Sequence, residues 1–361
     1  MTDHRLLTRP PWTPHSVFQG ELTRPPWTPH FVEPMAWYGY GMPSYDEPES
    51  FEAPVQPVDD PVSKPEWKEE FRWGRGLVAG RFLPVHKGHQ LLIEFARTRC
   101  KELVIAVRKQ EGDAIDHRQR LAWLRELYPK CKVIGDEDYG SIEAVFSSEK
   151  SHQDLADRLG AKLVLCDPER RLVPISGSRL REAPFLHWHY LPECVRPYFV
   201  KVVRVVGAEG SGKTTLCERL SLRFNTGFVP EFAASLAAQN GGRLEKRQLA
   251  EWALQHLATR QAMERLANRI LFLDTDLLTV ALWGERLYGE APLWIRTRKV
   301  HYDETLILEP VLGGLSSQQV NERQQFYDQW AGVSGVRLQG TWAEREQQAV
   351  AALGSRWKDL L

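Results

Sequence analysis

The stretch GRFLPVHKGH, residues 80–89, lies between an apolar run and a segment with helical periodicity. Its two histidines, His86 and His89, flank Gly88 at the point where the predicted helix begins. Glycine allows backbone to approach a phosphate closely, and a helix start offers unpaired N–H groups and the positive end of a dipole. Imidazole N–H groups can donate to phosphate oxygens whose charge changes during transfer. This stretch therefore predicts a cradle for a nucleoside triphosphate.

A second phosphate-binding element, GAEGSGKTT at residues 207–215, matches the pattern G-x-x-x-x-G-K-[ST] between a strand and a helix. We expect Lys213 to reach the β and γ oxygens of ATP, and Thr214 to bind Mg²⁺. The predicted ATP-binding residues of this loop are Gly207, Gly210, Gly212, Lys213, Thr214 and Thr215. Two triphosphate sites on one chain predict two reactions.

Composition restricts the class of protein. The 361 residues carry 47 basic and 47 acidic side chains, so bulk charge favours neither nucleic acid nor a membrane surface as a partner. No apolar run approaches the roughly 18 residues that span a bilayer, and no secretory signal is evident. The five cysteines form no C-x-x-C pair, which is typical of reduced thiols in a cytoplasmic protein. The composition does not argue for any particular oligomeric state.

Residues 1–73 differ from the rest of the chain. They hold more than half of the 23 prolines, and the segment LTRPPWTPH occurs twice, at residues 7–15 and 22–30. Proline at this density disfavours helices and sheet ladders. The segment is predicted to be a disordered tail, or else a Trp/Pro peptide that docks on a partner or on the protein's own surface.

From residue 74 onward the chain alternates strand and helix signals, the pattern of an α/β protein. We expect strands at 76–79, 102–107 and 162–166, and helices at 90–99, 117–128 and 154–159. After a boundary near 196–198, strands are expected at 201–206, 270–274 and 305–308, and helices at 216–224, 247–266, 321–330 and 343–353. In parallel sheets with helical crossovers, ligands bind at the carboxyl ends of the strands. Both phosphate-binding stretches follow a strand directly.

The first stretch resembles the G-x-F-x-P-x-H-x-G-H signature of the nucleotidyltransferase superfamily, and ISGSRLR at 175–181 resembles its second signature, I-S-x-T-x-x-R. The resemblance implies a Rossmann-like nucleotidyltransferase domain over 74–199, in which His86 and His89 contact the ATP phosphates. Ser178 is expected to cap the helix that follows it. The other expected ATP-binding residues are Gly80, Arg81, Phe82, Ser176, Ser178 and Arg181. Such a site works by positioning and charge stabilisation, without a protein nucleophile.

Further runs at 147–149, 159–161, 167–171 and 173–176 resemble the NadR-type family over residues 74–361. That family joins a nicotinamide mononucleotide (NMN) adenylyltransferase to a ribosylnicotinamide kinase. The resemblance implies a P-loop kinase domain over 200–361 and a bifunctional enzyme of NAD salvage, with ribosylnicotinamide, NMN and ATP as small-molecule substrates and Mg²⁺ as cofactor. Trp188 either stacks on a base or nicotinamide ring, or is a buried core residue.

The kinase half of the family also has acidic motifs that this chain matches. Asp274 ends an apolar strand, as a Walker B carboxylate should, and DTD at 274–276 resembles a family motif. Either Asp274 or Asp276 holds magnesium or contacts the ribose. Glu231 is a candidate substrate ligand or base.

At two places the sequence departs from the pattern of the family's kinase half, and these departures leave open whether that half is active. Residues 233–235 are Ala-Ala-Ser where the family has an arginine, and residues 312–316 read LGGLS where its lid reads DDGLR. A lid arginine commonly neutralises the transferring phosphate. Arg323, or Arg296 and Arg298, are the candidates to replace it. Two alternatives thus remain: an NMN adenylyltransferase whose kinase half only binds nucleotide, and a nucleotidyltransferase for another ester, such as phosphopantetheine or flavin mononucleotide.

A nucleotide-sensing regulator is the competing class, because some family members carry an N-terminal helix-turn-helix. The prolines of residues 1–73 leave no room for two uninterrupted helices, and the chain is electrically neutral. The sequence therefore predicts an enzyme that does not bind DNA.

Overall fold

The computed structural model describes residues 71–135 and 138–360. The predictions made for residues 1–70 lie outside this range. Residue 73, assigned above to the tail, is the first residue of a strand.

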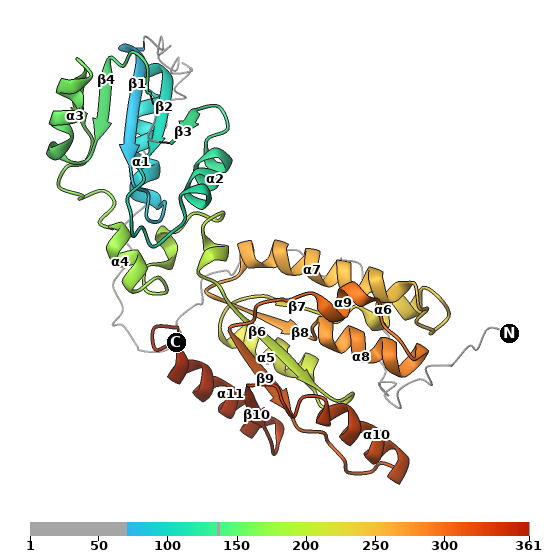
Figure 1. The fold of residues 1–361 in the computed structure, drawn as a ribbon. Helices are drawn as coiled ribbons and strands as arrows, with labels where there is room; N and C mark the ends of the chain where they lie inside the picture. Colours follow the sequence, from blue (N-terminus) through green and yellow to red (C-terminus); the bar gives the residue numbers. More distant parts are fainter. Residues whose placement is uncertain (1–70, 136–137, 361) are drawn as a thin grey trace, which may run out of the picture. The chain divides into compact units, whose positions relative to one another are not determined.

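The first sheet has five parallel strands in the order β3-β2-β1-β4-β5 (Figure 1). The strands are β1 Trp73–Gly80, β2 Cys100–Val107, β3 Lys132–Ile134, β4 Ala144–Ser147 and β5 Lys162–Leu165. The helices are α1 Lys87–Arg97, α2 His117–Leu127, α3 Gln153–Arg158 and α4 Gly177–Glu182, with 3₁₀ turns at Lys150–His152, Trp188–Tyr190 and Arg196–Tyr198. The three strands predicted for this domain are confirmed; β3 and β4, only three and four residues long, were not predicted.

The alternating direction of the side chains along β1 explains why both faces of this sheet are covered. Val78 joins the core cluster that contains apolar residues of α1 and α2, whereas Leu77 and Ala79 join the cluster that contains Leu155 of α3. Successive side chains of a strand point to opposite faces, so a continuous apolar run is expected of a strand buried on both sides.

The second sheet also has five parallel strands, in the order β10-β9-β6-β8-β7. They are β6 Lys201–Gly207, β7 Phe228–Val229, β8 Ile270–Asp274, β9 Glu304–Leu308 and β10 Val336–Leu338. The helices are α5 Lys213–Arg223, α6 Ala233–Ala238, α7 Gln248–Leu266, α8 Leu277–Tyr288, α9 Leu293–Thr297, α10 Ser317–Asp328 and α11 Trp342–Arg356. The sequence did not predict β7, β10, α6, α8 or α9.

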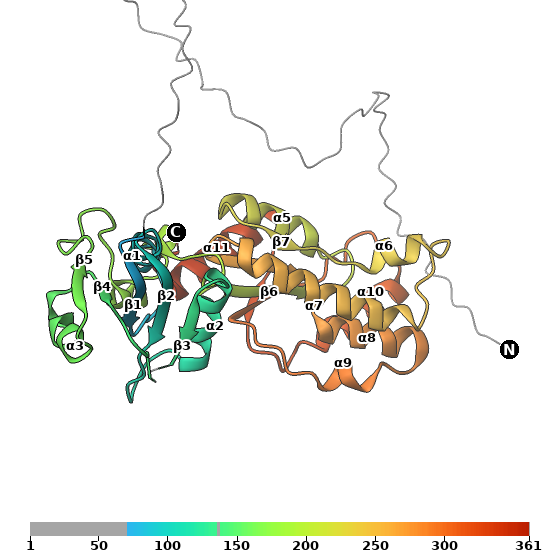
Figure 2. The same ribbon diagram turned by 90° about the horizontal axis from the view of Figure 1, so that it is seen from above.

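Helices cover both faces of the second sheet (Figure 2). Val206 and Ile307 pack with Leu282 of α8 and Tyr327 of α10. The opposite face of β6, which carries Val205, belongs to the cluster that contains residues of α5 and α11. Both halves of the described chain are thus doubly wound α/β sheets, as predicted.

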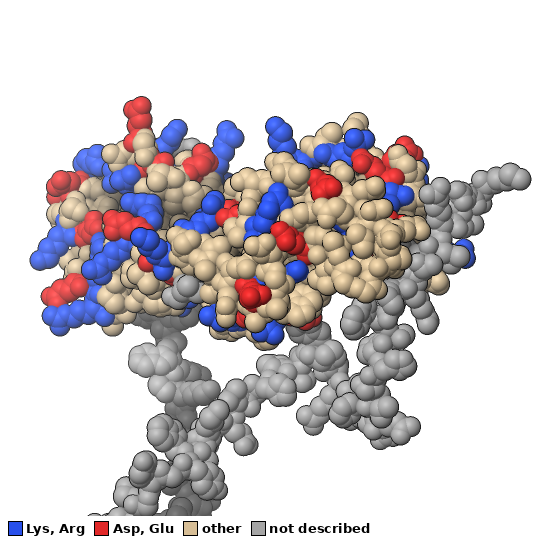
Figure 3. All heavy atoms as spheres, turned by 90° about the horizontal axis from the view of Figure 1, so that it is seen from below, with Lys and Arg blue, Asp and Glu red and all other residues tan. Residues whose placement is uncertain are grey.

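Acidic and basic side chains are intermingled on the face drawn in Figure 3. This mixture agrees with the equal numbers of the two charges in the sequence. None of the helices in the described ranges is both long enough and apolar enough to cross a bilayer.

Candidate active sites

The two histidines of the first stretch lie at the start of α1. His86 is the N-cap residue, and its Nδ1 accepts a hydrogen bond from the backbone N–H of His89 at 3.4 Å. The two rings are stacked, with centroids 3.7 Å apart. Because Nδ1 of His86 accepts a hydrogen bond, the neutral ring carries its proton on Nε2, where it can donate to a ligand.

Burial keeps both imidazoles neutral in the free protein. Burial and the nearby charge of Arg170 lower the pKa of His86 to about 4. Burial, followed by the charges of His86 and Arg170, holds the pKa of His89 well below its usual value. The pair therefore supplies neutral N–H donors at pH 7, and an anionic ligand would favour protonation.

The second signature lies directly against the first. A β-carbon at Gly177, the first residue of α4, would lie 2.3 Å from the carbonyl oxygen of Leu83, and Arg181 donates a hydrogen bond to that oxygen. A β-carbon at Gly88 would lie 3.8 Å from Ile175. The turn that starts α4 therefore adjoins the loop before α1, although nearly a hundred residues separate them in the sequence.

One cavity of about 380 Å³ joins these elements, a size typical of small-molecule sites. Its lining includes all of the residues predicted to contact ATP at the first site: Gly80, Arg81, Phe82, His86, His89, Ser176, Ser178 and Arg181. The histidine pair and the serine–arginine turn thus face a common space.

The helix cap in this site differs from the expectation. Ser176, not Ser178, is the N-cap of α4, and its Oγ accepts a hydrogen bond from the backbone N–H of Arg179. Ser178 lies in the first turn, with its Oγ 3.1 Å from that of Ser176. Both hydroxyls remain at the cavity, so the error concerns local geometry and not membership of the site.

Several cavity residues follow the ends of β2, β4 and β5 and had no predicted role. These are Arg108, Ser147, Ser148, Glu149, His152, Asp167 and Arg170. Ser147 Oγ lies 2.6 Å from His152 Nδ1, and Arg170 pairs with Glu149 at 2.8 Å. Their position after strand ends is a usable signal, but the sequence alone did not show that β4 is a strand.

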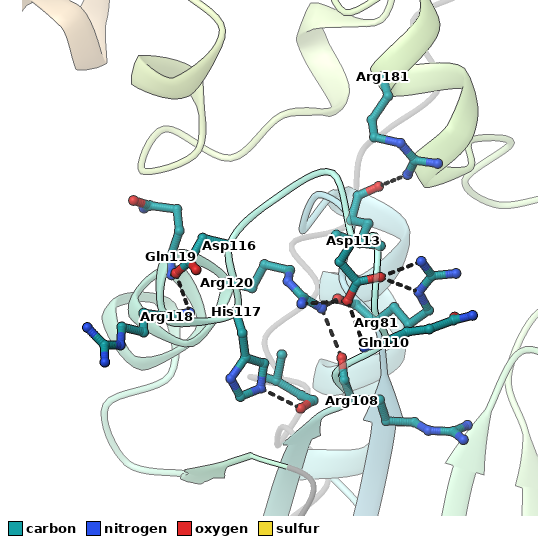
Figure 4. Close-up of polar contacts among 12 residues, drawn as sticks. Arg81, Arg108, Gln110, Asp113, Asp116, His117, Arg118, Gln119, Arg120 and Arg181 are labelled. Atoms are coloured by element: carbon teal, nitrogen blue, oxygen red, sulfur yellow. Dashed lines mark hydrogen bonds and ion pairs between the residues drawn. The ribbon is translucent and has the colours of Figure 1, made fainter.

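A buried ion cluster orients Arg81 at the edge of the cavity (Figure 4). Arg120 is fully buried and donates to the carbonyl oxygens of Arg81 at 2.6 Å and Arg108 at 2.9 Å. Asp113 accepts from both Arg120 and Arg81. Burial alone would raise the pKa of Asp113, but these arginines and the Gln110 N–H outweigh burial and lower it. Asp113 is therefore a carboxylate that fixes the arginine next to the cavity.

The second loop, after β6, has the geometry of a phosphate-binding loop. Gly210 and Gly212 have φ angles of +70° and +89°, which favour glycine. Lys213 Nζ donates to the carbonyl oxygen of Ala208 at 3.2 Å, and Thr215 is exposed in the first turn of α5. Gly207 is the last residue of β6, and a β-carbon there would lie too close to the carbonyl oxygen of Leu308.

Thr214 and Asp274 meet at the base of this loop. Thr214 Oγ1 donates to Asp274 Oδ2 at 2.5 Å, while Asp274 Oδ1 is buried without a hydrogen-bond partner among the described residues. A hydroxyl beside a carboxylate with an unused oxygen fits the few protein ligands that Mg²⁺ takes when it binds with substrate phosphates. Burial raises the pKa of Asp274, against the lowering effect of Lys213 and Thr214.

Glu231 follows β7 and shares the electrostatic environment of Lys213 and Asp274. Burial raises its pKa, and the Lys213 charge opposes that shift. A carboxylate with a raised pKa beside a phosphate-binding loop is a better proton acceptor than an ordinary surface glutamate.

Comparisons with known proteins match both α/β domains. A family described as cytidylyltransferase-like matches residues 77–169, and a family described as AAA domain matches residues 202–356. The trifunctional NAD biosynthesis/regulator protein NadR of Salmonella typhimurium is 29% identical over 280 residues, with 65% of this chain and 68% of the relative covered. Its Escherichia coli counterpart is 28% identical over the same shares of each chain.

Solved structures show the same two-domain fold. A NadR crystal structure in complex with NR matches 79% of this chain and 96% of its own chain, with a TM-score of 0.64 at 21% identity. A NadR structure with NAD and AMP-PNP has a TM-score of 0.63 at 20% identity and covers the same shares of each chain. The chain is similar to NadR proteins in sequence and in fold across both of its α/β domains.

Two residues predicted to contact substrate have partners within the protein. Trp188 is 6% exposed, packs in the core 6.3 Å from Phe185 and is not part of the cavity lining. Asp276 is the N-cap of α8 and accepts from the backbone N–H of Thr279 at 2.9 Å, while Arg204 occupies its other oxygen at 2.5 Å. These placements favour the core alternative for Trp188, and they favour Asp274 over Asp276 as the magnesium ligand.

Proposed function

We propose that the chain is a bifunctional enzyme of NAD salvage. Residues 200–361 form the domain that phosphorylates ribosylnicotinamide to NMN with ATP, and residues 74–199 form the domain that converts NMN and ATP to NAD and pyrophosphate. The observation that carries the proposal is the single cavity shared by the histidine pair and the serine–arginine turn. The NadR relatives support nicotinamide substrates over other phosphate esters.

In the adenylyltransferase domain, a phosphate oxygen of NMN attacks the α-phosphorus of ATP. The bond from that phosphorus to the α–β bridging oxygen breaks, and pyrophosphate leaves with the electron pair. His86 and His89 donate to the phosphate oxygens as charge shifts toward the leaving group. The nucleotide and its leaving phosphates are held by Gly80, Arg81, Phe82, Ser176, Ser178 and Arg181. No protein nucleophile takes part.

In the kinase domain, a hydroxyl of ribosylnicotinamide attacks the γ-phosphorus of ATP, and ADP leaves. Lys213 and the loop N–H groups hold the phosphates, and Glu231 accepts the hydroxyl proton. Thr214 and Asp274 would hold Mg²⁺, which neutralises phosphate charge when bound. Trp188 and Asp276 have less support as substrate contacts, because both are buried among protein partners.

The proposed location is the cytoplasm. All five cysteines lie in the described ranges as free thiols, a pattern typical of reducing compartments. The proposed partners are small molecules, and the equal numbers of acidic and basic residues give no electrostatic reason for a nucleic-acid partner or a membrane surface.

One incubation tests the division of labour between the halves. Ribosylnicotinamide, Mg²⁺ and ATP are supplied to the wild type, His89→Ala and Lys213→Ala proteins, and NMN and NAD are measured over time. We expect NAD from the wild type, accumulated NMN from His89→Ala, and neither product from Lys213→Ala. NMN supplied directly to Lys213→Ala is expected to give NAD.

Other outcomes identify the alternatives. If NMN and ATP give no pyrophosphate while phosphopantetheine or flavin mononucleotide does, the first domain is a nucleotidyltransferase for another ester. If NMN is converted but ribosylnicotinamide is not, the second domain binds nucleotide without turnover.

A further inference from the structure

The segment between β9 and α10 contains no basic side chain. Residues 309–322 include no lysine or arginine, so the first cation after β9 is Arg323, on α10. A kinase that transfers phosphate needs a donor for the charge that develops on the transferring group, beyond the lysine of the phosphate-binding loop. This inference rests on the kinase activity proposed above.

The guanidinium of Arg323 lies over the phosphate-binding loop. A β-carbon at Gly210 would lie 2.8 Å from Nη2 and 3.1 Å from Cζ of Arg323. Nη1 donates to the carbonyl oxygen of Val311 at 2.8 Å, which ties the segment after β9 to the same side chain. Among the described residues, Nη2 and Nε of Arg323 have no protein acceptor, so these donors are available to a ligand.

Two other arginines of this domain, Arg296 and Arg345, are engaged elsewhere. Arg296 pairs with Glu285 of α8 at 3.3 Å. Arg345, the other arginine that contacts the loop, is 5% exposed and donates to the carbonyl oxygens of Gly340 and Ser211 at 2.9 and 3.0 Å. Arg345 therefore braces the loop, whereas Arg323 presents unused donors over it.

We propose that Arg323 contacts the phosphoryl group that the kinase domain transfers, replacing an arginine in the segment after β9. As the substrate hydroxyl oxygen bonds to the γ-phosphorus, the bond to the β–γ bridging oxygen breaks and ADP leaves with that electron pair. Arg323 donates to the γ-phosphoryl oxygens during this exchange. The hydroxyl proton passes to Glu231, so atoms and charge balance.

The first arm of the test measures nucleotide binding in the full-length protein. Binding of AMP-PNP and ADP with Mg²⁺ is measured by calorimetry, and the component lost in Lys213→Ala defines the kinase site. We expect Arg323→Ala to weaken AMP-PNP about tenfold or more and to leave ADP within about twofold, because the contact is to the γ-phosphate. Arg323→Lys should recover part of the preference for AMP-PNP over ADP, and Arg296→Ala should match the wild type in its affinity for both nucleotides.

The second arm measures turnover in the same preparations. Arg323→Ala should lower kcat for ribosylnicotinamide phosphorylation by roughly a hundredfold to a thousandfold, as loss of a transferring-phosphate arginine does elsewhere. NMN adenylylation by the first domain should be unchanged, and retained ADP binding at the kinase site shows that the second domain is folded.

The outcomes separate the two proposals. An unchanged preference for AMP-PNP over ADP in Arg323→Ala overturns the role of Arg323, and so does kinase turnover equal to the wild type. A wild-type protein that cannot phosphorylate ribosylnicotinamide refutes the proposed kinase activity. The binding measurements alone then decide whether Arg323 contacts the γ-phosphate. If Arg323→Ala weakens the binding of AMP-PNP and ADP equally, Arg323 only stabilises the loop.

Discussion

Asp274 and Asp276 are two residues apart, but their carboxylates differ in how many of their oxygens are hydrogen-bonded. Asp274 keeps one buried oxygen that has no partner within the part of the chain that the structure describes, and burial raises its pKa. Both oxygens of Asp276 are bonded, one of them to Arg204. The first arrangement is suited to a ligand, whereas the second stabilises the fold.

We expect different losses when each aspartate is replaced. Asp276→Asn should lower the free energy of unfolding by about 3 kcal/mol, because it leaves the Arg204 charge unpaired. Asp274→Asn should abolish phosphorylation of ribosylnicotinamide without loss of stability. Urea unfolding followed by tryptophan fluorescence, with the kinase assay in parallel, measures both effects. A stable but inactive Asp276→Asn protein would instead identify Asp276 as a substrate ligand.

His256 is a second residue whose surroundings have a measurable consequence. It is 1% exposed, and neither ring nitrogen has a hydrogen-bond partner among the described residues. Burial is the main reason that its pKa falls to about 4; the Asp276 charge raises the pKa and the Arg260 charge lowers it. The unfolded chain therefore binds this proton at a higher pH than the folded protein does.

The free energy of unfolding should therefore fall as the pH is lowered from 6.5 toward 4. His256 alone accounts for about 3 kcal/mol of this loss, and its contribution is fully present above pH 6.5. Melting temperatures recorded across this range should decline less steeply for His256→Leu than for the wild type. The exposed His301, with 82% of its side chain accessible, provides the control variant His301→Leu. Identical slopes for all three proteins would show that His256 does not titrate in this range.

At the scale of elements, the phosphate-binding loop depends on the helix that follows β10. Trp342, at the first position of α11, lies against Gly212, where a β-carbon would come within 1.8 Å of its ring. Arg345 of the same helix holds the carbonyl oxygen of Ser211. Both residues of α11 thus shape the loop without occupying its phosphate-facing N–H groups.

Gly212→Ala should therefore weaken MgATP at the kinase site by about tenfold or more, because the methyl group clashes with Trp342 and a φ of +89° disfavours alanine. Gly241 also has a positive φ, of +63°, but nothing lies within 4 Å of a β-carbon there. Gly241→Ala should cost only stability, about 1 kcal/mol, and leave nucleotide binding intact. Calorimetry on both variants makes the comparison, and unaltered affinity in Gly212→Ala would contradict this packing argument.

For the whole molecule, charge distribution sets the expectation for nucleic acid. The relatives are named as regulators as well as biosynthetic proteins, yet this chain has equal numbers of acidic and basic residues. Because DNA binding draws most of its affinity from phosphate neutralisation, we expect no sequence-specific complex in gel shifts at low salt. A tight complex with a defined operator would make the chain a regulator.

Most of the elements that could be predicted from sequence are long or continuously apolar, although the twelve-residue helix α8 was missed. Buried runs such as 201–206 and 270–274 stand out because both faces of a parallel strand are apolar. The strands β3, β4, β7 and β10, of two to four residues, are too short to show a period. The cavity residues that follow β4 were missed for the same reason.

The sequence by itself determined the two phosphate-binding loops, since glycine spacing, the histidine pair and Lys213 act through local backbone geometry. It also predicted that ISGSRLR belongs with the first loop. Only the tertiary structure decided that Arg204 pairs with Asp276, that Arg170 and His86 line one cavity, and that Arg323 lies over Gly210. Each of these contacts joins different elements, and strand order, which short-range patterns do not encode, brings them together.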